Sequence, residues 1–251
     1  MTVMQTIALD AGYGHHTVLH NVALTVETGT FTALIGANGS GKSTLLRTLS
    51  GAQAPLAGKV LLSGTDIGRL RAADRARRLA MVFTDRTGGG GLSVRETVEI
   101  GRHPYTGLLG HLSDADRAIV DESLRAVGMA SMEKRLLGTL SDGERQKVMI
   151  ARALAQDTPL IILDEPTAFL DVAGRIEITA LLRRLTDKGK AIILSTHDVS
   201  SAIAAADILW TVDKAEGRVL AADRDTAIAQ GIPDRAFPGL HFDKTTYSFI
   251  L

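Results

Sequence analysis

FTALIGANGSGKSTLLRTLSG at residues 31–51 is the stretch that decides the fold. The apolar run 31–35 predicts a buried strand, and residues 43–49 predict a helix that ends before Gly51. Between them, residues 36–43 fit the phosphate-loop pattern GxxxxGK[ST] without a mismatch. Glycines let the backbone N–H groups turn inward, and the positive end of the helix dipole adds to their attraction. We therefore expect this loop to hold a polyphosphate.

Two side chains of the loop have distinct predicted roles. Lys42 is expected to reach the β- and γ-phosphates of ATP, and Ser43 to place its hydroxyl on Mg²⁺. The alternative is a glycine-rich turn that only links a strand to a helix, but the flanking sequence favours the phosphate loop. The predicted ATP-binding residues of this segment are Gly36, Asn38, Gly39, Ser40, Gly41, Lys42, Ser43 and Thr44.

A second informative stretch is LIILDE at residues 160–165. Its four apolar residues predict a central strand whose carboxyl end carries Asp164 and Glu165, beside the phosphates. Asp164 is expected to hold Mg²⁺, and Glu165 to accept a proton from the attacking water. The alternative is a solvated acidic turn before Pro166, which the matched phosphate loop disfavours.

A capping-box pattern lies between these two stretches, in LSDGE at residues 140–144. Ser141 and Glu144 have the spacing of the box, so a helix is expected to begin there and to present free N–H groups to an anion. A capping box by itself is usually only structural.

LSDGE and the following RQKVMIARAL at residues 145–154 resemble the nucleotide-binding subunits of ABC transporters, which carry LSGGQ at this place. The resemblance implies an ATPase in which this helix holds the γ-phosphate of an ATP bound by a second subunit. Ser141 and Gly143 are therefore expected to contact ATP.

Three smaller matches have the same order along the chain as in that family. The resemblance implies that Asp171 belongs to a loop that crosses the dimer, that His197 contacts the γ-phosphate and orders the catalytic site, and that Tyr13 stacks on adenine. Taken singly, His197 could be a capped or buried histidine and Tyr13 could fill the edge of a sheet.

One position departs from the family pattern. Thr84 stands after the strand-like residues 79–83, where the family has a glutamine that approaches Mg²⁺ and the attacking water. Thr84 or Asp85 could replace it, and the sequence does not decide between them. Glycines at 88–91 suggest a segment that orders only on docking with a membrane partner.

Two further departures are substitutions within the matched motifs. Asp142 replaces a signature glycine, and an acidic side chain near phosphate is unfavourable unless it points away. Phe169 replaces a residue that is usually small, and both are interpreted as tolerated variation.

The expected fold class is α/β, with a P-loop NTPase core, a mostly parallel sheet, an N-terminal antiparallel β subdomain and an inserted helical subdomain. One ABC ATPase domain is expected over 1–251, with its core at about 1–84 and 158–251 and the insertion at about 85–157. Predicted strands lie near 5–9, 18–26, 31–35, 59–62, 79–83, 160–163, 191–195 and 208–212, and later helices near 173–186 and 199–206.

Two more capping boxes mark helix starts in the expected insertion. Ser93 pairs with Glu96 and Ser113 with Asp116, while the apolar spacing of 118–127 predicts a helix with a buried face.

Composition is compatible with this prediction. The chain has 251 residues, 45% of them hydrophobic, and no cysteine, so disulfides and thiolate chemistry are excluded. No stretch approaches the roughly twenty apolar residues of a membrane span, and residues 1–10 lack the pattern of a secretory signal. A net charge of zero gives no basic footprint for nucleic acid. The arginines between 69 and 78 are interpreted as a solvated helix face.

A narrower resemblance concerns the transported substrate. GRHPY at 101–105 and SDADR at 113–117 resemble the importer subfamily for ferric siderophores, haem and cobalamin. The implied function is ATP hydrolysis that powers uptake through a separate permease. Two alternatives stay open: a soluble non-transport ABC ATPase, and an ABC subunit for a different substrate.

The resemblance also implies partners and a location. ATP and Mg²⁺ are the expected cofactors. The expected partners are a second copy in a head-to-tail dimer, integral-membrane permease subunits and, indirectly, a substrate-binding protein, with no nucleic acid. The expected location is peripheral, on the cytoplasmic face of the inner membrane.

Overall fold

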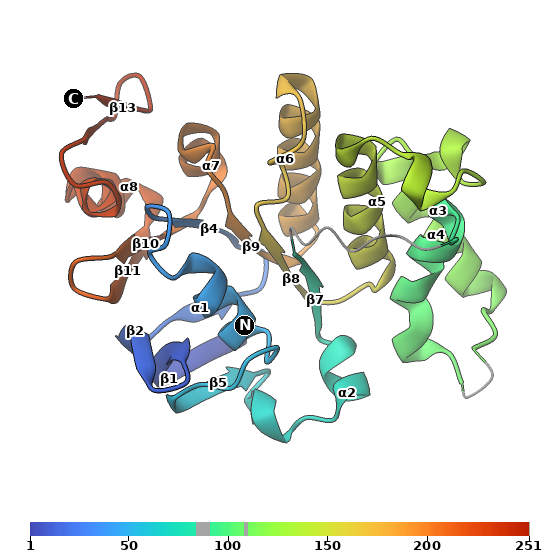
Figure 1. The fold of residues 1–251 in the computed structure, drawn as a ribbon, viewed down its shortest axis with the longest axis horizontal. Helices are drawn as coiled ribbons and strands as arrows, with labels where there is room; N and C mark the ends of the chain where they lie inside the picture. Colours follow the sequence, from blue (N-terminus) through green and yellow to red (C-terminus); the bar gives the residue numbers. More distant parts are fainter. Residues whose placement is uncertain (84–90, 108–109, 251) are drawn as a thin grey trace.

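The computed structural model of the chain describes residues 1–83, 91–107 and 110–250. Within these ranges the larger sheet has the strand order β11-β10-β4-β9-β8-β7, and every pair is parallel except β10 with β11 (Figure 1). The run LIIL is apolar throughout, and FTALI has only one polar residue, Thr32, because both faces of a parallel sheet are covered. Its strands are β4 (Phe31–Ile35), β7 (Leu79–Val82), β8 (Leu160–Asp164), β9 (Ala191–Ser195), β10 (Ile208–Asp213) and β11 (Arg218–Asp223).

The smaller sheet is antiparallel and lies at the N-terminal end of the chain. Its strand order is β2-β1-β5-β6, with β3 paired to β1. The strands are β1 (Thr2–Tyr13), β2 (His16–Val22), β3 (Thr25–Glu27), β5 (Ala57–Leu62) and β6 (Thr65–Asp66).

The single strand predicted at 18–26 is two strands, β2 and β3. The break falls at residues 23–24, shortly after Asn21, a residue within β2 whose φ of 48° lies in the left-handed region. Leu24 then donates its N–H to the hydroxyl of Thr6, at 2.8 Å, instead of continuing the ladder of β2. Period-two spacing of apolar residues continues through this break, which explains why the sequence pattern does not reveal it.

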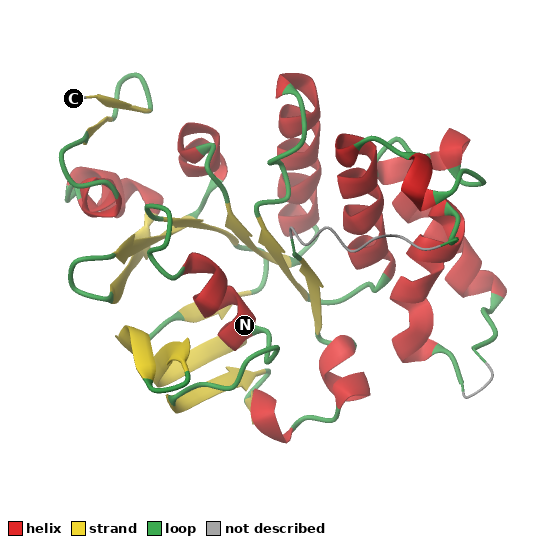
Figure 2. Ribbon diagram, viewed as in Figure 1, coloured by secondary structure: helices red, strands yellow, loops and turns green. Residues whose placement is uncertain are grey.

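Side chains of the larger sheet alternate between two hydrophobic cores. Leu34 and Ile162 pack with α1 and the antiparallel sheet, whereas Ala33 and Leu163 pack with α5, α6 and α7. Figure 2 shows α1 between the two sheets, and α6 and α7 on the other side of the larger one. These helices are α1 (Lys42–Leu49), α5 (Asp142–Ala155), α6 (Val172–Asp187) and α7 (Val199–Ala205).

Short helices precede α5 and, together with it, form the helical region between β7 and β8. The three predicted capping boxes, which begin α3, α4 and α5, are all formed. Figure 1 shows this region beside the β7 edge of the sheet. Its other elements are α3 (Val94–Glu99), η2 (Ile100–Tyr105), α4 (Asp114–Ala126), η3 (Ala130–Met132) and η4 (Leu137–Thr139).

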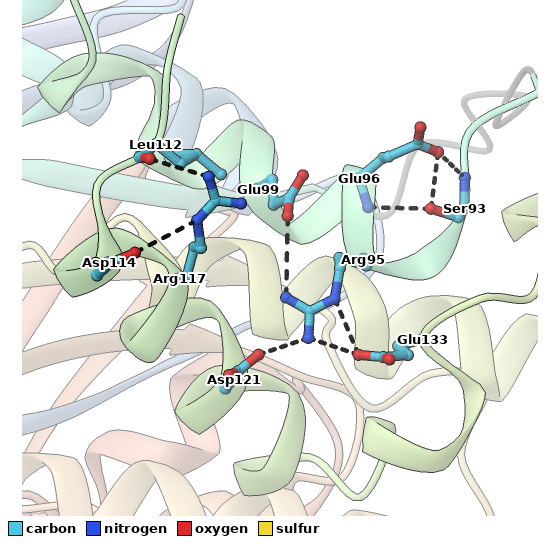
Figure 3. A network of polar contacts seen from close by, with 9 residues as sticks. All are labelled: Ser93, Arg95, Glu96, Glu99, Leu112, Asp114, Arg117, Asp121 and Glu133. Carbon is cyan, nitrogen blue, oxygen red and sulfur yellow. Dashed lines mark hydrogen bonds and ion pairs between the residues drawn. The ribbon is translucent and has the colours of Figure 1, made fainter.

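A polar network holds part of this region together (Figure 3). Arg95 on α3 contacts Asp121 on α4 and Glu133 after η3, each at 2.5 Å, and lies 3.9 Å from Glu99. One guanidinium therefore joins two helices and a loop. Arg117 and Asp114, in the same figure, form a longer and more exposed pair at 3.9 Å.

The prediction that the arginines between 69 and 78 form one solvated helix face was wrong for Arg75 and Arg78, which are only partly exposed. Helix α2 spans only Ala72–Ala76. Arg75, Arg77 and Arg78 donate to backbone carbonyls of other segments, those of Gly51, Pro104 and Leu62.

The C-terminal part contains elements that the sequence patterns do not predict. Phe237, Phe242, Tyr247 and Phe249 form edge-to-face ring pairs around a small hairpin. The elements are α8 (Arg224–Ala229), η5 (Ile232–Ala236), β12 (His241–Asp243) and β13 (Ser248–Ile250). Among all the helices so described, none is both long and apolar enough to cross a membrane.

Candidate nucleotide-binding site

The phosphate loop leaves β4 and enters α1 through backbone that only glycine adopts easily. Gly39 and Gly41 have φ values of 67° and 106°, in the left-handed region. A Cβ at Gly41 would also lie 2.8 Å from a methyl carbon of Val18. Space and backbone conformation therefore both require glycine where α1 begins.

Two polar side chains of the loop are buried. Lys42 Nζ donates to the carbonyls of Gly36, at 2.7 Å, and Ala37, at 3.2 Å. The hydroxyl of Ser40 is buried and has no hydrogen-bond partner among the described residues. A buried unpaired polar group is costly, so a ligand that accepted from it would remove that cost. The donors of the loop thus fit a phosphate group.

The charge environment of Lys42 is shaped by the carboxylates that follow β8. Burial lowers the pKa of the Lys42 ammonium, and the negative charges of Glu165 and Asp164 oppose this shift.

A cavity of about 300 Å³ lies over the loop. It brings together four segments of the chain: β1, β2, the phosphate loop with the start of α1, and the end of β8. The lining residues are Tyr13, Val18, Asn38, Gly39, Ser40, Gly41, Lys42, Ser43, Thr44 and Glu165.

Asp164 and Glu165 end β8 and are both tied to Ser195, the opposite residue on β9. The Ser195 hydroxyl donates to Asp164 Oδ1 at 2.5 Å. Glu165 has a φ of 52°, which is strained for a residue with a side chain. Its N–H donates to both the carbonyl, at 3.0 Å, and the hydroxyl, at 3.1 Å, of Ser195. Ser195 therefore holds the carboxylate of Asp164 and the backbone from which the side chain of Glu165 projects.

Sequence reasoning did not identify Ser195 as part of the site. A serine in the last position of a buried strand, just before Thr196 and His197, was the available signal. The sequence could not show that Ser195 lies opposite Asp164, because this pairing depends on the register of β8 with β9.

His197 follows β9 and lies next to Glu165. His197 Nε2 is 2.6 Å from Glu165 Oε1, a hydrogen-bond distance, and the imidazole is about half exposed. These two residues, both predicted to serve catalysis, are therefore in contact although they are 32 positions apart in the sequence.

Tyr13, at the end of β1, also lines the cavity. Its hydroxyl lies 2.6 Å from the hydroxyl of Thr44, and half of the residue is exposed. This contact fixes the phenol end of the ring while part of the side chain stays accessible.

The helix that begins at LSDGE does not contribute to this cavity, since neither Ser141 nor Gly143 lines it. A Cβ at Gly143 would lie 3.0 Å from the carbonyl oxygen of Phe169, so the start of α5 packs against the loop before α6. Asp171 caps α6, and its Oδ1 accepts the N–H of Gly174 at 2.8 Å. None of these three residues lines the cavity over the phosphate loop of their own chain.

The donor set for a divalent cation is small. No cluster of three His, Cys, Asp or Glu side chains suited to a metal occurs among the residues that are described. Ser43 and Asp164 could supply one hydroxyl and one carboxylate oxygen, and Mg²⁺ is commonly bound through one or two carboxylates together with phosphates. These residues fit an ion that binds together with nucleotide. Thr84 and Asp85, the candidates for the missing glutamine, and the glycines at 88–90 lie outside the described residues.

A glycine loop between a parallel strand and a helix, with carboxylates at the end of a neighbouring strand, defines a P-loop nucleotide-binding protein. A sequence profile described as ABC transporter matches residues 19–168. This chain belongs to the ABC transporter family of ATP-binding proteins, and it is an ATPase.

Curated relatives agree with this assignment. The chain is 44% identical over 206 residues to an uncharacterized ABC transporter ATP-binding protein of Methanocaldococcus jannaschii, covering 82% of this chain and 71% of that protein. It is 40% identical to an iron(3+)-hydroxamate import ATP-binding protein of Bacillus subtilis, covering 80% and 76%. It is also 40% identical to a cobalamin import ATP-binding protein of Halobacterium salinarum, covering 86% of this chain and 54% of that protein.

Solved structures have the same fold. An ATP-binding subunit of an ABC transporter superposes with a TM-score of 0.82 at 27% identity, covering 92% of this chain and 94% of that one. A bacterial ABC transporter cassette described as dimeric superposes with a TM-score of 0.78 at 26% identity, covering 88% and 98%.

Proposed function

We propose that the chain powers the uptake of an iron chelate (a siderophore complex), haem or cobalamin through a separate membrane permease. The observation that carries the catalytic part is the cavity that unites the phosphate loop with Glu165, itself paired with His197. Relatives named for iron(3+)-hydroxamate and cobalamin import support the substrate group.

In the proposed site, the loop amides and Lys42 hold the phosphates of ATP. Lys42 would exchange its carbonyl contacts with Gly36 and Ala37 for phosphate oxygens, which are better partners for an ammonium group. Tyr13 would stack on adenine, with its hydroxyl held by Thr44. Bound Mg²⁺, held by Ser43 and Asp164, would neutralise charge on the phosphates.

Hydrolysis requires that a water attack the γ-phosphorus while ADP leaves. Glu165 would accept the proton of that water, since its carboxylate faces the cavity. His197 would hold the carboxylate in position through its 2.6 Å contact and would reach the γ-phosphate from its exposed side. Ser195 holds the backbone of Glu165 and the side chain of Asp164, so both would be oriented before ATP arrives.

The site of one chain is completed by a second copy. Ser141, Gly143 and Asp171 do not line the cavity over their own phosphate loop, and a solved relative is described as dimeric. In a head-to-tail dimer these residues would contact the ATP bound by the partner. The chain would sit at the cytoplasmic face of the membrane through contact with permease subunits, and a substrate-binding protein would deliver the cargo to the permease. No nucleic acid is expected to bind.

The test is to identify the membrane partner. Glu165→Gln, tagged and loaded with ATP, is captured from detergent-solubilised membranes of the native host, and its partners are identified by mass spectrometry. Lys42→Ala, which should fail to hold ATP, is the matched control. We expect a polytopic permease in the first sample, with genetic or physical linkage to a substrate-binding protein. Ribosomal or chromosomal partners would instead favour a soluble, non-transport ABC ATPase.

The substrate group needs a separate measurement. A strain that lacks the chain should lose uptake of one labelled iron chelate, haem or cobalamin, and the wild-type chain should restore it. Normal uptake of all three classes would overturn the substrate proposal and leave the ATPase assignment untouched.

A further inference from the structure

The first turn of α5 carries two carboxylates, and each has an arginine within 4 Å. Asp142 Oδ1 lies 3.3 Å from Arg145 Nη1, and Glu144 Oε1 lies 3.9 Å from Arg135 Nη1. Glu144 also accepts the N–H and the hydroxyl of Ser141, so it is engaged in the capping box. The turn is therefore nearly neutral although it presents two acidic side chains.

The guanidinium of Arg145 is held beside Asp142 by a second contact. Its Nη2 donates to the carbonyl of Leu140 at 3.3 Å. Its Nε is buried and has no hydrogen-bond partner among the described residues. The hydrogen-bonding capacity of the Arg145 guanidinium is therefore only partly used. Besides the carbonyl of Leu140, the guanidinium contacts the carboxylate of Asp142.

We propose that Arg145 is a positioning residue that cancels the charge of Asp142, so that the LSDGE helix can accept a phosphate despite an acidic side chain in its first turn. This inference rests on the proposed function, in which the helix faces ATP bound by the partner.

The charges of the turn have opposite effects on folding and on ligand binding. A carboxylate in the first turn favours the helix, because it lies at the positive end of the dipole. The same carboxylate repels a triphosphate that approaches the free N–H groups of the turn. An arginine three residues later lies on the same face of the helix and can remove the repulsion without removing the carboxylate.

The pair is partly exposed, with 27% of the Arg145 side chain and 49% of the Asp142 side chain accessible. An ion pair of this kind contributes little to folding. The effect of the pair on the binding of a triphosphate is larger than its effect on folding. With Arg145 present, each phosphate charge faces a neutral pair, and without it each one faces an uncompensated carboxylate.

The experiment is a double-mutant cycle for Asp142 and Arg145 in the Glu165→Gln chain. The measured quantity is the ATP concentration that gives half-maximal dimer, followed by sedimentation velocity, together with ATP binding to the monomer. Arg145→Gln should raise that concentration about tenfold, because one uncompensated charge then faces the triphosphate. Asp142→Gly should not raise it, and the double variant should match Asp142→Gly.

Three controls separate charge from structure. Arg145→Lys should behave like the parent chain, since it keeps the positive charge. Lys147→Gln removes a charge from the same helix but from a residue that pairs with Glu177, at 3.4 Å, so it should have no effect. High salt should shrink the effect of Arg145→Gln, which a purely structural role would not predict.

Each other outcome is decisive. An unchanged ATP requirement in a folded Arg145→Gln chain would overturn the inference and leave the proposed function intact. If Arg145→Gln raised the ATP requirement equally in chains with Asp142 and in chains with Asp142→Gly, Arg145 would act independently of Asp142. That result would also overturn the inference. Failure of the Glu165→Gln parent to dimerise, despite binding ATP, would contradict the proposed ATP-linked dimer itself.

Discussion

At the scale of single residues, the site depends on the strained turn at the end of β8. Glu165, which lines the cavity, has a left-handed backbone, and its N–H donates to both the carbonyl and the hydroxyl of Ser195. Strain of this kind persists only where surrounding contacts determine it, and it is frequent at functional sites.

Replacing Glu165 by glutamine tests the proposed base. Glutamine keeps the size of the side chain but cannot accept a proton at neutral pH. We expect the rate of ATP hydrolysis to fall by about 10²- to 10⁴-fold, with ATP binding retained. Steady-state phosphate release and equilibrium ATP binding check the two halves of this statement. Hydrolysis that was unchanged would assign the base elsewhere.

Replacing Ser195 by alanine tests the support of the carboxylates. The variant loses the 2.5 Å hydrogen bond to Asp164 and the hydroxyl contact with the N–H of Glu165. Loss of such an orienting partner typically costs about 10- to 100-fold in metal affinity or activity. We expect hydrolysis to require more Mg²⁺ than in the wild type, as measured by titrating Mg²⁺ at saturating ATP. Thr158→Ala removes a buried hydroxyl that lies just before the start of β8 and donates to the carbonyl of Leu160, whereas Asp164 ends that strand, so this variant is the control for stability.

At the scale of elements, a buried ion pair joins η2, α4 and the end of α5. Arg102 donates to Asp116 Oδ1 and to the carbonyl of Ala155, both at 2.8 Å. Their side chains are only 7% and 12% exposed. Asp116 is also the acidic member of the capping box with Ser113, so a single carboxylate both begins α4 and ties it to its neighbours.

Arg102→Met should destabilise the chain by about 2–3 kcal/mol, because it leaves a buried carboxylate and a carbonyl without their donor. The free energy of unfolding in urea measures this cost. Arg117→Met removes the exposed arginine of Figure 3, which lies 3.9 Å from Asp114, and should change stability by less than about 0.5 kcal/mol. Equal effects of the two substitutions would contradict the structural role assigned to Arg102.

The carboxylate of Asp116 should also make the stability of the chain depend on pH in the acid range. Hydrogen bonds from the Ser113 hydroxyl and N–H, and then from Arg102, lower the pKa of Asp116 from its ordinary value of 3.8 to about 2. A lowered pKa means that the contribution is present above pH 3.8 and is lost as pH falls toward 2. The corresponding free energy is about 2 kcal/mol. Stability measured from pH 5 to pH 2 should fall less steeply in Asp116→Asn than in the wild type, and parallel curves would contradict this assignment.

At the scale of the whole molecule, the cavity is assembled from elements that are distant in the sequence and that share one hydrophobic core. Tyr13 comes from the antiparallel sheet, Lys42 from α1, and Glu165 from the larger sheet. A ligand that contacts all three should therefore stabilise the assembly of the two sheets, because it binds only when they are in place.

ATP should raise the thermal midpoint of the Glu165→Gln chain in a concentration-dependent way. At a concentration 100 times its dissociation constant, a ligand that binds only the folded state adds about 2.7 kcal/mol. Lys42→Ala should lose most of this shift in a differential scanning experiment, whereas its stability without nucleotide should change less. A shift that was equal in both chains would place ATP outside this cavity.

Much of the fold could be predicted from local patterns. Apolar runs predicted β4, β8 and β9, and the spacing of Ser with Glu or Asp predicted the starts of α3, α4 and α5. These signals are local, since a strand buried on both faces and a helix cap depend on residues close in sequence. The break between β2 and β3 and the C-terminal hairpin were not predicted, because each is fixed by contacts with distant segments.

The sequence alone determined the phosphate loop, the family resemblance and the carboxylates that follow β8, because each is a short pattern whose chemistry depends on residue type and spacing. Only the tertiary structure decided which groups meet. The register of β8 with β9 places Ser195 against Asp164 and Glu165, and folding brings His197 to Glu165. That Gly143 and Asp171 do not line the cavity over their own phosphate loop is likewise a property of the packed helices. Hydrogen bonds and charge pairs act only between atoms a few ångströms apart, and the number of residues between two groups in the sequence does not determine their distance in space.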